Sequence, residues 1–250
     1  MRRWLLPALL IATLIGVWQI AASSGTLADV LNLPSILVPS PAEVAESLWH
    51  NRELLAENAW VTLKEILLGL SLALVVGLAF GFAMHLSRLA RDTFNPLIVA
   101  SQTVPILVIA PILVIWLGFG IWPKVAVIAL VCFFPITVNV LAGLRSVDPE
   151  AIKMMRTLDA SRRQILRRVE SPAALPNFFT GMKVAVVIAP IGAVFGEWVG
   201  ANQGLGHSIL YDNAQLQTAS LFADVVLLSA MALALFALIA LIERRVVTWR

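Results

Sequence analysis

Six apolar segments, each close to the length that crosses a lipid bilayer, constrain this chain of 250 residues more than any other feature. A transmembrane helix needs about 20 mostly apolar residues. Only 13% of the residues are charged, against about 25% in a typical soluble domain. We therefore predict an all-α polytopic membrane protein with six transmembrane helices. The expected spans are residues 4–22, 59–84, 95–117, 125–142, 176–200 and 221–242.

The positive charges predict how these helices are oriented. All but four of the 18 Lys and Arg residues lie near the chain ends, after the second span, or between the fourth and fifth spans. The exceptions are Arg52, Lys64, Lys124 and Lys183. Since Lys and Arg accumulate in cytoplasmic loops, both termini are expected in the cytoplasm. The net charge of +3 is explained better by this topology than by nucleic-acid binding, because the basic residues flank apolar runs.

The first 58 residues are expected to form the first span and an outer segment, and residues 59–250 the core domain. The first apolar run could instead be a cleaved signal peptide, since Ala21, Ala22 and Ser23 resemble a cleavage site. We favour a retained span because the run approaches the required ~20 residues. Ser40 before Pro41 predicts an amphipathic helix that reaches Trp49.

Polar residues inside the apolar segments are candidates for a translocation pathway: Gln102, Asn139 and Glu197. Acids within a membrane are costly and usually face a cavity or a partner. Glu197 is expected to face a cavity near its outer mouth, although an acid reaching the interface is the alternative. Kinked, proline-containing spans often line pathways, although the kink alone can be structural.

Glycines recur every fourth residue in the fifth span, at Gly192, Gly196 and Gly200. Such a stripe lets a neighbouring helix approach closely. We expect helix packing at these three positions.

The tract from Asp148 to Pro172 is the longest strongly charged stretch of the chain, and it predicts a cytoplasmic elbow of two short helices within residues 145–175. Asp148 is expected to cap the first helix and Ser161 the second, which should end before Pro172. Asp159 lies between them, and Asp is among the few residues that tolerate the left-handed backbone region.

Catalytic and metal-binding patterns are absent from the sequence. It contains no G-x-x-x-x-G-K-[ST] phosphate loop, its three histidines have no metal-ligand spacing, and the single Cys132 lies in an apolar run. No catalytic residue, metal site or cofactor is expected in this chain.

The elbow and several short motifs resemble the permeases of binding-protein-dependent, type I ABC importers. The motifs are RTLDASRRQILRRVESPAALP at 156–176, QTVP at 102–105, WLGFG at 116–120, FFPI at 133–136, AGLRSVDPE at 142–150 and GEWVGANQGLG at 196–206. The resemblance covers nearly the whole chain. It is closest to the branch that imports nitrate, sulfonates, taurine and pyrimidine precursors of thiamine, and GEWVGA favours the last of these. The family's own elbow signature is poorly kept, because only Pro172 is identical and Lys153 stands where the family has an acid.

This resemblance implies the permease subunit of an importer in the bacterial inner membrane, and no enzyme. The implied partners are a second copy of this chain in a homodimer, an extracytoplasmic solute-binding protein, and a separate cytoplasmic ATPase that carries ATP and Mg. A small polar solute would pass between the two permease chains, and Glu197 would face that cavity. The elbow would contact the ATPase through Lys153, Met154, Met155, Leu158, Asp159, Ala160, Ser161 and Arg162.

The competing interpretation is a membrane anchor or an intramembrane enzyme. An enzyme needs paired groups at one depth, yet Lys183 and Glu197 are about 14 residues apart, or ~21 Å along one helix. An anchor would not need three prolines in its third span.

Overall fold

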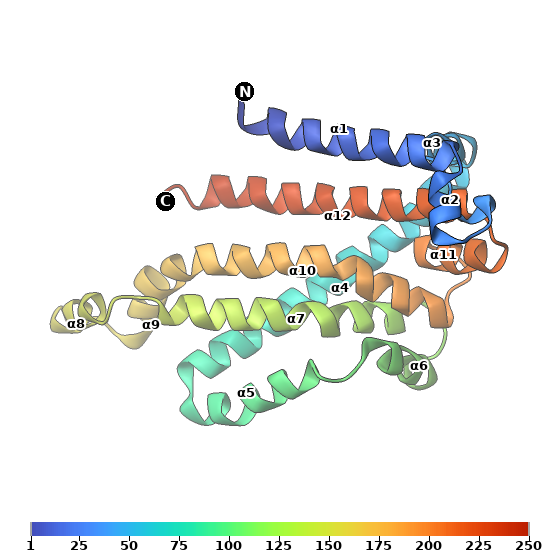
Figure 1. Ribbon diagram of the computed structural model, residues 1–250. Coiled ribbons are helices and arrows are strands. Elements are labelled where there is room, and N and C mark those ends of the chain that lie inside the picture. Colours follow the sequence, from blue (N-terminus) through green and yellow to red (C-terminus); the bar gives the residue numbers. More distant parts are fainter. Residues whose placement is uncertain (1, 250) are drawn as a thin grey trace. The chain divides into compact units, whose positions relative to one another are not determined.

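The computed structural model describes residues 2–249, with side chains from Leu5 onward. All regular secondary structure in this range is helical (Figure 1). The elements are α1 (Arg2–Ser23), α2 (Thr26–Leu31), η1 (Ser35–Leu37), α3 (Pro41–His50), α4 (Arg52–Leu86), α5 (Arg88–Ser101), α6 (Ile106–Leu117), α7 (Ile121–Arg145), α8 (Pro149–Thr157), α9 (Arg162–Ile165), η2 (Leu166–Glu170), α10 (Ser171–Gly200), α11 (Leu205–Ala214) and α12 (Thr218–Val246). The predicted basic end residues Arg2, Arg3 and Arg250 lie outside the described side chains.

Five stretches in the described part are long and apolar enough to cross a membrane: Leu5–Ser23, Arg52–Leu86, Ile121–Arg145, Arg162–Gly200 and Thr218–Val246. The prediction of an all-helical, multi-span protein is therefore confirmed.

The expected third span is not one continuous helix, so the prediction of a kink within a single helix was wrong, while the count of six spans stays a prediction. Its residues fall in α5 and α6, which are bent by 103° at the break between them. Pro105 lies at this break as the N-cap of α6, with extended backbone. A proline has no N–H to donate and disfavours helical geometry in the preceding residue. The chain therefore stops one helix and starts another in a new direction.

Two compact units divide the described residues. The first contains residues up to Thr62 together with Asn202–Ser229. Within it, Trp18 Nε1 donates to the Pro39 carbonyl (3.1 Å). Ser40 and Glu43 form a reciprocal capping box at the start of α3, which confirms the helix predicted from Pro41. The N–H of Gly204 donates to Asn58 Oδ1 (3.0 Å) and holds the α11 end to the first turns of α4.

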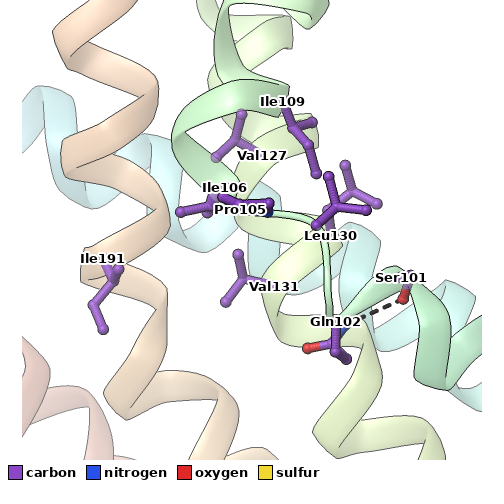
Figure 2. A pocket seen from close by; sticks show the side chains of 10 residues that line it. Ser101, Gln102, Pro105, Ile106, Ile109, Val127, Leu130, Val131 and Ile191 are labelled. Atoms are coloured by element: carbon purple, nitrogen blue, oxygen red, sulfur yellow. Dashed lines mark hydrogen bonds between the residues drawn. The ribbon is translucent and has the colours of Figure 1, made fainter.

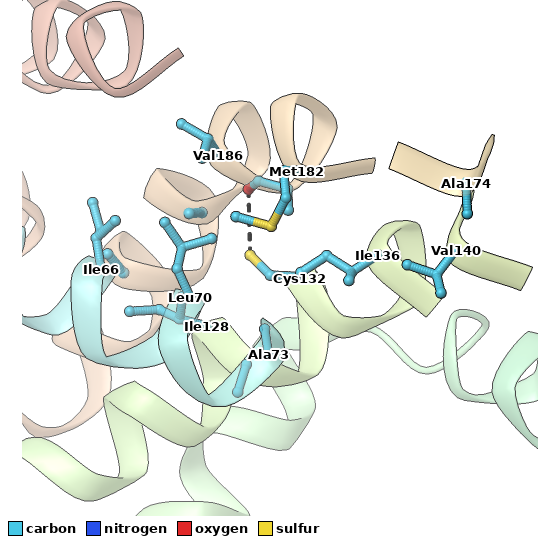
Figure 3. Close-up of a cluster of buried hydrophobic side chains, with 14 of the residues drawn as sticks. Ile66, Leu70, Ala73, Ile128, Cys132, Ile136, Val140, Ala174, Met182 and Val186 are labelled. Atoms are coloured by element: carbon cyan, nitrogen blue, oxygen red, sulfur yellow. Dashed lines mark hydrogen bonds between the residues drawn. The ribbon is translucent and has the colours of Figure 1, made fainter. Parts of the chain in front are cut away.

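The second unit contains Leu63–Ala201 and Ala230–Arg250, and its core is formed by α4, α7 and α10 (Figure 3). Ile128 of α7 is fully buried at the centre. A Cβ atom added to Gly69 of α4 would lie 2.5 Å from Ile128 Cβ, and one added to Gly192 of α10 would lie 3.0 Å from Ile128 Cα. Glycine on both flanking helices therefore lets their backbones close on this isoleucine. Cys132, one turn further along α7, donates from Sγ to the Ala185 carbonyl (3.3 Å).

The second elbow helix does not end before Pro172, and this expectation was wrong. Helical structure runs from Arg162 through the π-helical turn η2 into α10. The N–H of Ser171 donates to the Leu166 carbonyl, five residues back. A π turn just before Pro172 changes the local hydrogen-bond register, so the missing proline N–H falls within the first turn of α10, where proline is tolerated.

Candidate functional site

Local hydrogen bonds shape the elbow as its sequence predicts. Asp148 Oδ1 accepts from the Glu150 N–H (2.9 Å) and caps α8. Ser161 caps α9 and exchanges hydrogen bonds with Gln164 in a capping box. Asp159, between the two helices, has a φ of 55°, in the left-handed region. The predictions for all three residues are confirmed.

A buried acid holds the elbow to the membrane helices. Glu170 is only 2% exposed and accepts from Arg162 Nη1 (2.5 Å) through Oε1. Its other oxygen lies 2.9 Å from Nε2 of His85, near the end of α4. The same His85 nitrogen lies 2.9 Å from Arg162 Nη2. This cluster of Glu170, Arg162 and His85 was not predicted, although a lone acid following four arginines was a signal of an ion pair.

Large apolar side chains are exposed on the face of the elbow that points away from the rest of the chain. Met154 is 63% exposed and Leu158 is 68% exposed. Ile165 of α9, by contrast, is only 1% exposed, so the chain itself covers this residue. Lys153 Nζ contacts Glu150 Oε1 (2.7 Å), and both side chains are exposed. Of the remaining predicted coupling residues, Asp159, Ser161 and Arg162 are exposed, and Met155 and Ala160 are half-buried.

Gln102 lines a cavity of about 290 Å³ where α5 breaks from α6 (Figure 2). Its Nε2 donates to Ser101 Oγ (3.2 Å). The other walls are apolar and come from α6, from Leu130 and its neighbours on α7, and from Ile191 on α10. The broken helix therefore leaves the polar side chains of Ser101 and Gln102 at a cavity whose other lining side chains are apolar.

The other two predicted pathway residues lie elsewhere. Asn139 is half-buried and donates from Nδ2 to the Pro135 carbonyl on its own helix (2.8 Å). Glu197 is fully buried, at 0% exposed, within the packing of α10. Neither lines the cavity beside Gln102.

Glu197 belongs to a buried charged cluster with residues that the sequence analysis did not single out. Lys124 Nζ of α7 contacts Glu65 Oε1 of α4 (2.6 Å), and both side chains are nearly inaccessible. Glu197 interacts with Glu65, and the neighbouring Gly196 lets the Lys124 backbone approach, since an added Cβ would lie 3.1 Å from its Cα. The signal was a glutamate within the second apolar segment and a lysine directly before the fourth, 59 positions apart.

The described residues contain no group of three His, Cys, Asp or Glu side chains that could hold a metal ion. The charged side chains within each cluster bind one another, so their role here is structural and electrostatic.

Comparisons with known proteins identify relatives along nearly the whole chain. Residues 69–248 match the family described as binding-protein-dependent transport system inner membrane component. An ABC transporter permease protein of Haemophilus influenzae is 37% identical over 234 residues, covering 94% of this chain and 93% of the relative. The formylaminopyrimidine transport permease protein ThiX of Halalkalibacterium halodurans is 37% identical over 244 residues, covering 98% of this chain and 95% of that protein.

A solved structure agrees at the level of fold. A chain of the MetNI methionine ABC transporter in an inward-facing conformation matches with a TM-score of 0.70 and 21% identity, covering 78% of this chain and 97% of the other. At this identity the likeness shows the fold alone.

Proposed function

We propose a specific role for this chain on the premise that it belongs to the binding-protein-dependent transport system inner membrane components. It is the permease subunit of an ABC importer, a transporter component rather than an enzyme, and ATP is hydrolysed on a separate subunit. The alternative of a membrane anchor or intramembrane enzyme was wrong. The predicted boundary between residues 58 and 59 stays a prediction.

The proposed coupling surface is the outer face of the elbow, formed by Met154 and Leu158. The observation that carries this proposal is that these two large apolar side chains, in the second half of α8 and at its C-cap, are more than 60% exposed. Leu158 lies four residues before Arg162, the first residue of α9, which is held by the buried Glu170. An exposed apolar surface on a firmly held segment can transmit a movement from one protein to another, because the segment does not shift relative to the membrane helices it is bound to. The partner is a cytoplasmic ATPase that carries ATP and Mg.

The test is Leu158→Glu in the reconstituted complex, measured as substrate-stimulated ATP hydrolysis and as co-purification of the ATPase. A charge placed in a buried interface opposes association by several kcal/mol, so binding and stimulation should both fall. Leu89→Glu is the matched control, because Leu89 on α5 is 77% exposed and lies outside the elbow residues 145–175. Full ATPase binding and stimulation in Leu158→Glu would refute the coupling surface.

We further propose that the chain lies in the bacterial inner membrane with both termini in the cytoplasm. The positive-inside distribution supports this orientation. The contact of Lys183 Nζ with Glu243 Oε2 (2.7 Å) supports it as well, because it joins the C-terminal end of α12 to the first half of α10, which follows the elbow. Cysteines introduced at Ser161 and at Gln203 should label from opposite sides of the membrane, and the buried Cys132 should stay silent. Labelling from one side alone would refute the topology.

The pathway is proposed to run past Gln102, at the interface with a second permease chain. The cavity at the α5–α6 break supports this role for Gln102. Gln102→Leu should reduce uptake at equal expression while ATPase binding is kept. Glu197→Leu tests the acid in the same assay, and unimpaired uptake would remove Glu197 from the pathway.

The solute is proposed to be a small polar molecule, and a pyrimidine precursor of thiamine is the first candidate. The supporting observation is the full-length similarity to ThiX, which is named for formylaminopyrimidine transport. A binding screen on the partner solute-binding protein, with taurine, alkylsulfonates and nitrate as competitors, tests this assignment. Tight binding of one of these competitors instead would refute it.

A further inference from the structure

A groove of about 400 Å³ lies beside the elbow, on the side away from Met154 and Leu158. Its walls are the ends of α4 and α7 and one face of α8. Arg145, Lys153 and Arg156 supply its basic lining. Leu144 and Ile152 supply its main apolar surface.

The helical period separates this groove from the proposed coupling surface. Pro149, Ile152, Lys153 and Arg156 all line the groove, which is the i, i+3, i+4, i+7 pattern of a single helix face. Met154 and Leu158 are four residues apart on another face of the same chain segment. One short helix therefore presents an apolar surface outward and a basic surface toward the membrane helices.

Two of the three positive charges in the groove, those of Arg145 and Arg156, are not balanced by the acids around it, whereas Lys153 pairs with Glu150. Glu170 also lines the groove, but its two oxygens are taken by Arg162 and His85. Within the described side chains, neither Arg145 nor Arg156 forms a salt bridge with an acid, and the charge of Arg91 acts on Arg145 as a second cation. Like charges that line one groove repel each other, so an anion that binds there lowers the free energy of the protein.

We propose that this groove binds a phosphate group, supplied by the headgroup of an anionic lipid or by free phosphate. Guanidinium groups match phosphate oxygens in geometry and charge. The groove lies at the ends of α4 and α7, two helices that are long and apolar enough to cross a membrane, and spanning helices leave the hydrocarbon core through the headgroup region. Basic pockets between spans on the cytoplasmic side are suited to anionic headgroups, and the apolar Leu144 and Ile152 suit the first carbons of the lipid. This proposal does not depend on what binds Met154 and Leu158.

The experiment uses native mass spectrometry of the purified importer complex with phosphatidylglycerol, phosphatidylcholine or inorganic phosphate. We expect phosphatidylglycerol to be retained over phosphatidylcholine. Removing one basic side chain near a lipid surface should weaken binding about fivefold, so Arg145→Gln with Arg156→Gln should weaken it about 25-fold. Arg163→Gln is the matched control, because Arg163 is exposed in the same elbow but does not line the groove.

The outcomes separate the sources of the phosphate. Inorganic phosphate that binds alone and displaces the lipid supports the site with free phosphate as its ligand, whereas retention of lipid only supports the headgroup. Equal retention of both lipids, or equal losses in Arg163→Gln and the double variant, would overturn the proposal. So would a complex that binds neither probe while the double variant loses the ATPase, since the groove would then be a protein contact.

Discussion

Glu170 Oε2 lies 2.9 Å from Nε2 of His85, across 85 residues of sequence, and this contact joins the elbow to the end of α4. Arg162 binds the other Glu170 oxygen. One buried carboxylate, directly before α10, therefore holds the start of α9 and the start of α10 to α4. Motion of the elbow is thereby tied to motion of the spans.

Glu170→Gln should loosen the elbow. The amide keeps the shape but removes the charge that Arg162 and His85 contact. Breaking a buried ion pair costs about 3–5 kcal/mol, and we expect roughly 2 kcal/mol here because the Arg162 side chain is 46% exposed. Trypsin cleavage in the basic stretch 162–168 should become about 30-fold faster. Glu150→Gln is the control, since its contact with Lys153 is exposed, and equal acceleration in both variants would contradict the anchoring role.

Gly196→Leu should separate α10 from α7. A Cβ at this position would already lie 3.1 Å from Lys124 Cα, and overpacking of this kind costs about 1–3 kcal/mol. The thermal midpoint in detergent and the assembly of the complex should both fall. Leu233→Ala is a suitable control because Leu233 on α12 is 69% exposed. If both variants are tolerated equally, the glycine does not lie at a tight crossing.

Lys124→Met should leave Glu65 buried without its cation. The expected loss of stability is about 3–5 kcal/mol, because an unpaired buried charge is strongly destabilising. Adding Glu65→Leu should recover part of this loss, since apolar side chains can replace a buried ion pair at little cost. Unfolding in detergent by increasing denaturant measures both variants. A double variant no more stable than Lys124→Met would show that the buried charge is not the cause.

Asp212 on α11 should make stability depend on pH. Burial raises the pKa of this carboxyl above its ordinary value of 3.8, and Asp224 of α12 is the acid that lies near it. The folded state therefore holds the Asp212 proton more tightly than the unfolded chain does. Its contribution is fully present below pH 3.8 and is lost as the pH rises through the raised pKa.

The measurement for Asp212 is the thermal midpoint of the wild-type chain minus that of Asp212→Asn, followed from pH 4 to pH 7. This difference should decrease as the pH rises, because the amide stays neutral throughout. A difference that stays constant or increases would contradict the raised pKa.

Local interactions are what the sequence determined well. The Asp148 and Ser161 caps, the left-handed Asp159 and the apolar spans depend on residues within one or two helical turns of each other. Even the failure at the third span was local in origin, since Pro105 was visible as a proline but its effect was predicted as a kink within one helix. Whether a proline bends a helix or ends it depends on which neighbours pack against the two halves.

Only the tertiary structure decided which distant side chains meet. Glu65, Lys124 and Glu197 come from three helices, and nothing in their local sequence predicts that they share one buried cluster. The same holds for His85 and Glu170, and for the two faces of α8, one turned outward and one lining a basic groove. The physical reason is that a charge within an apolar protein must find a partner, but helix packing, set by close contacts such as Ile128 between two glycines, selects which partner it finds.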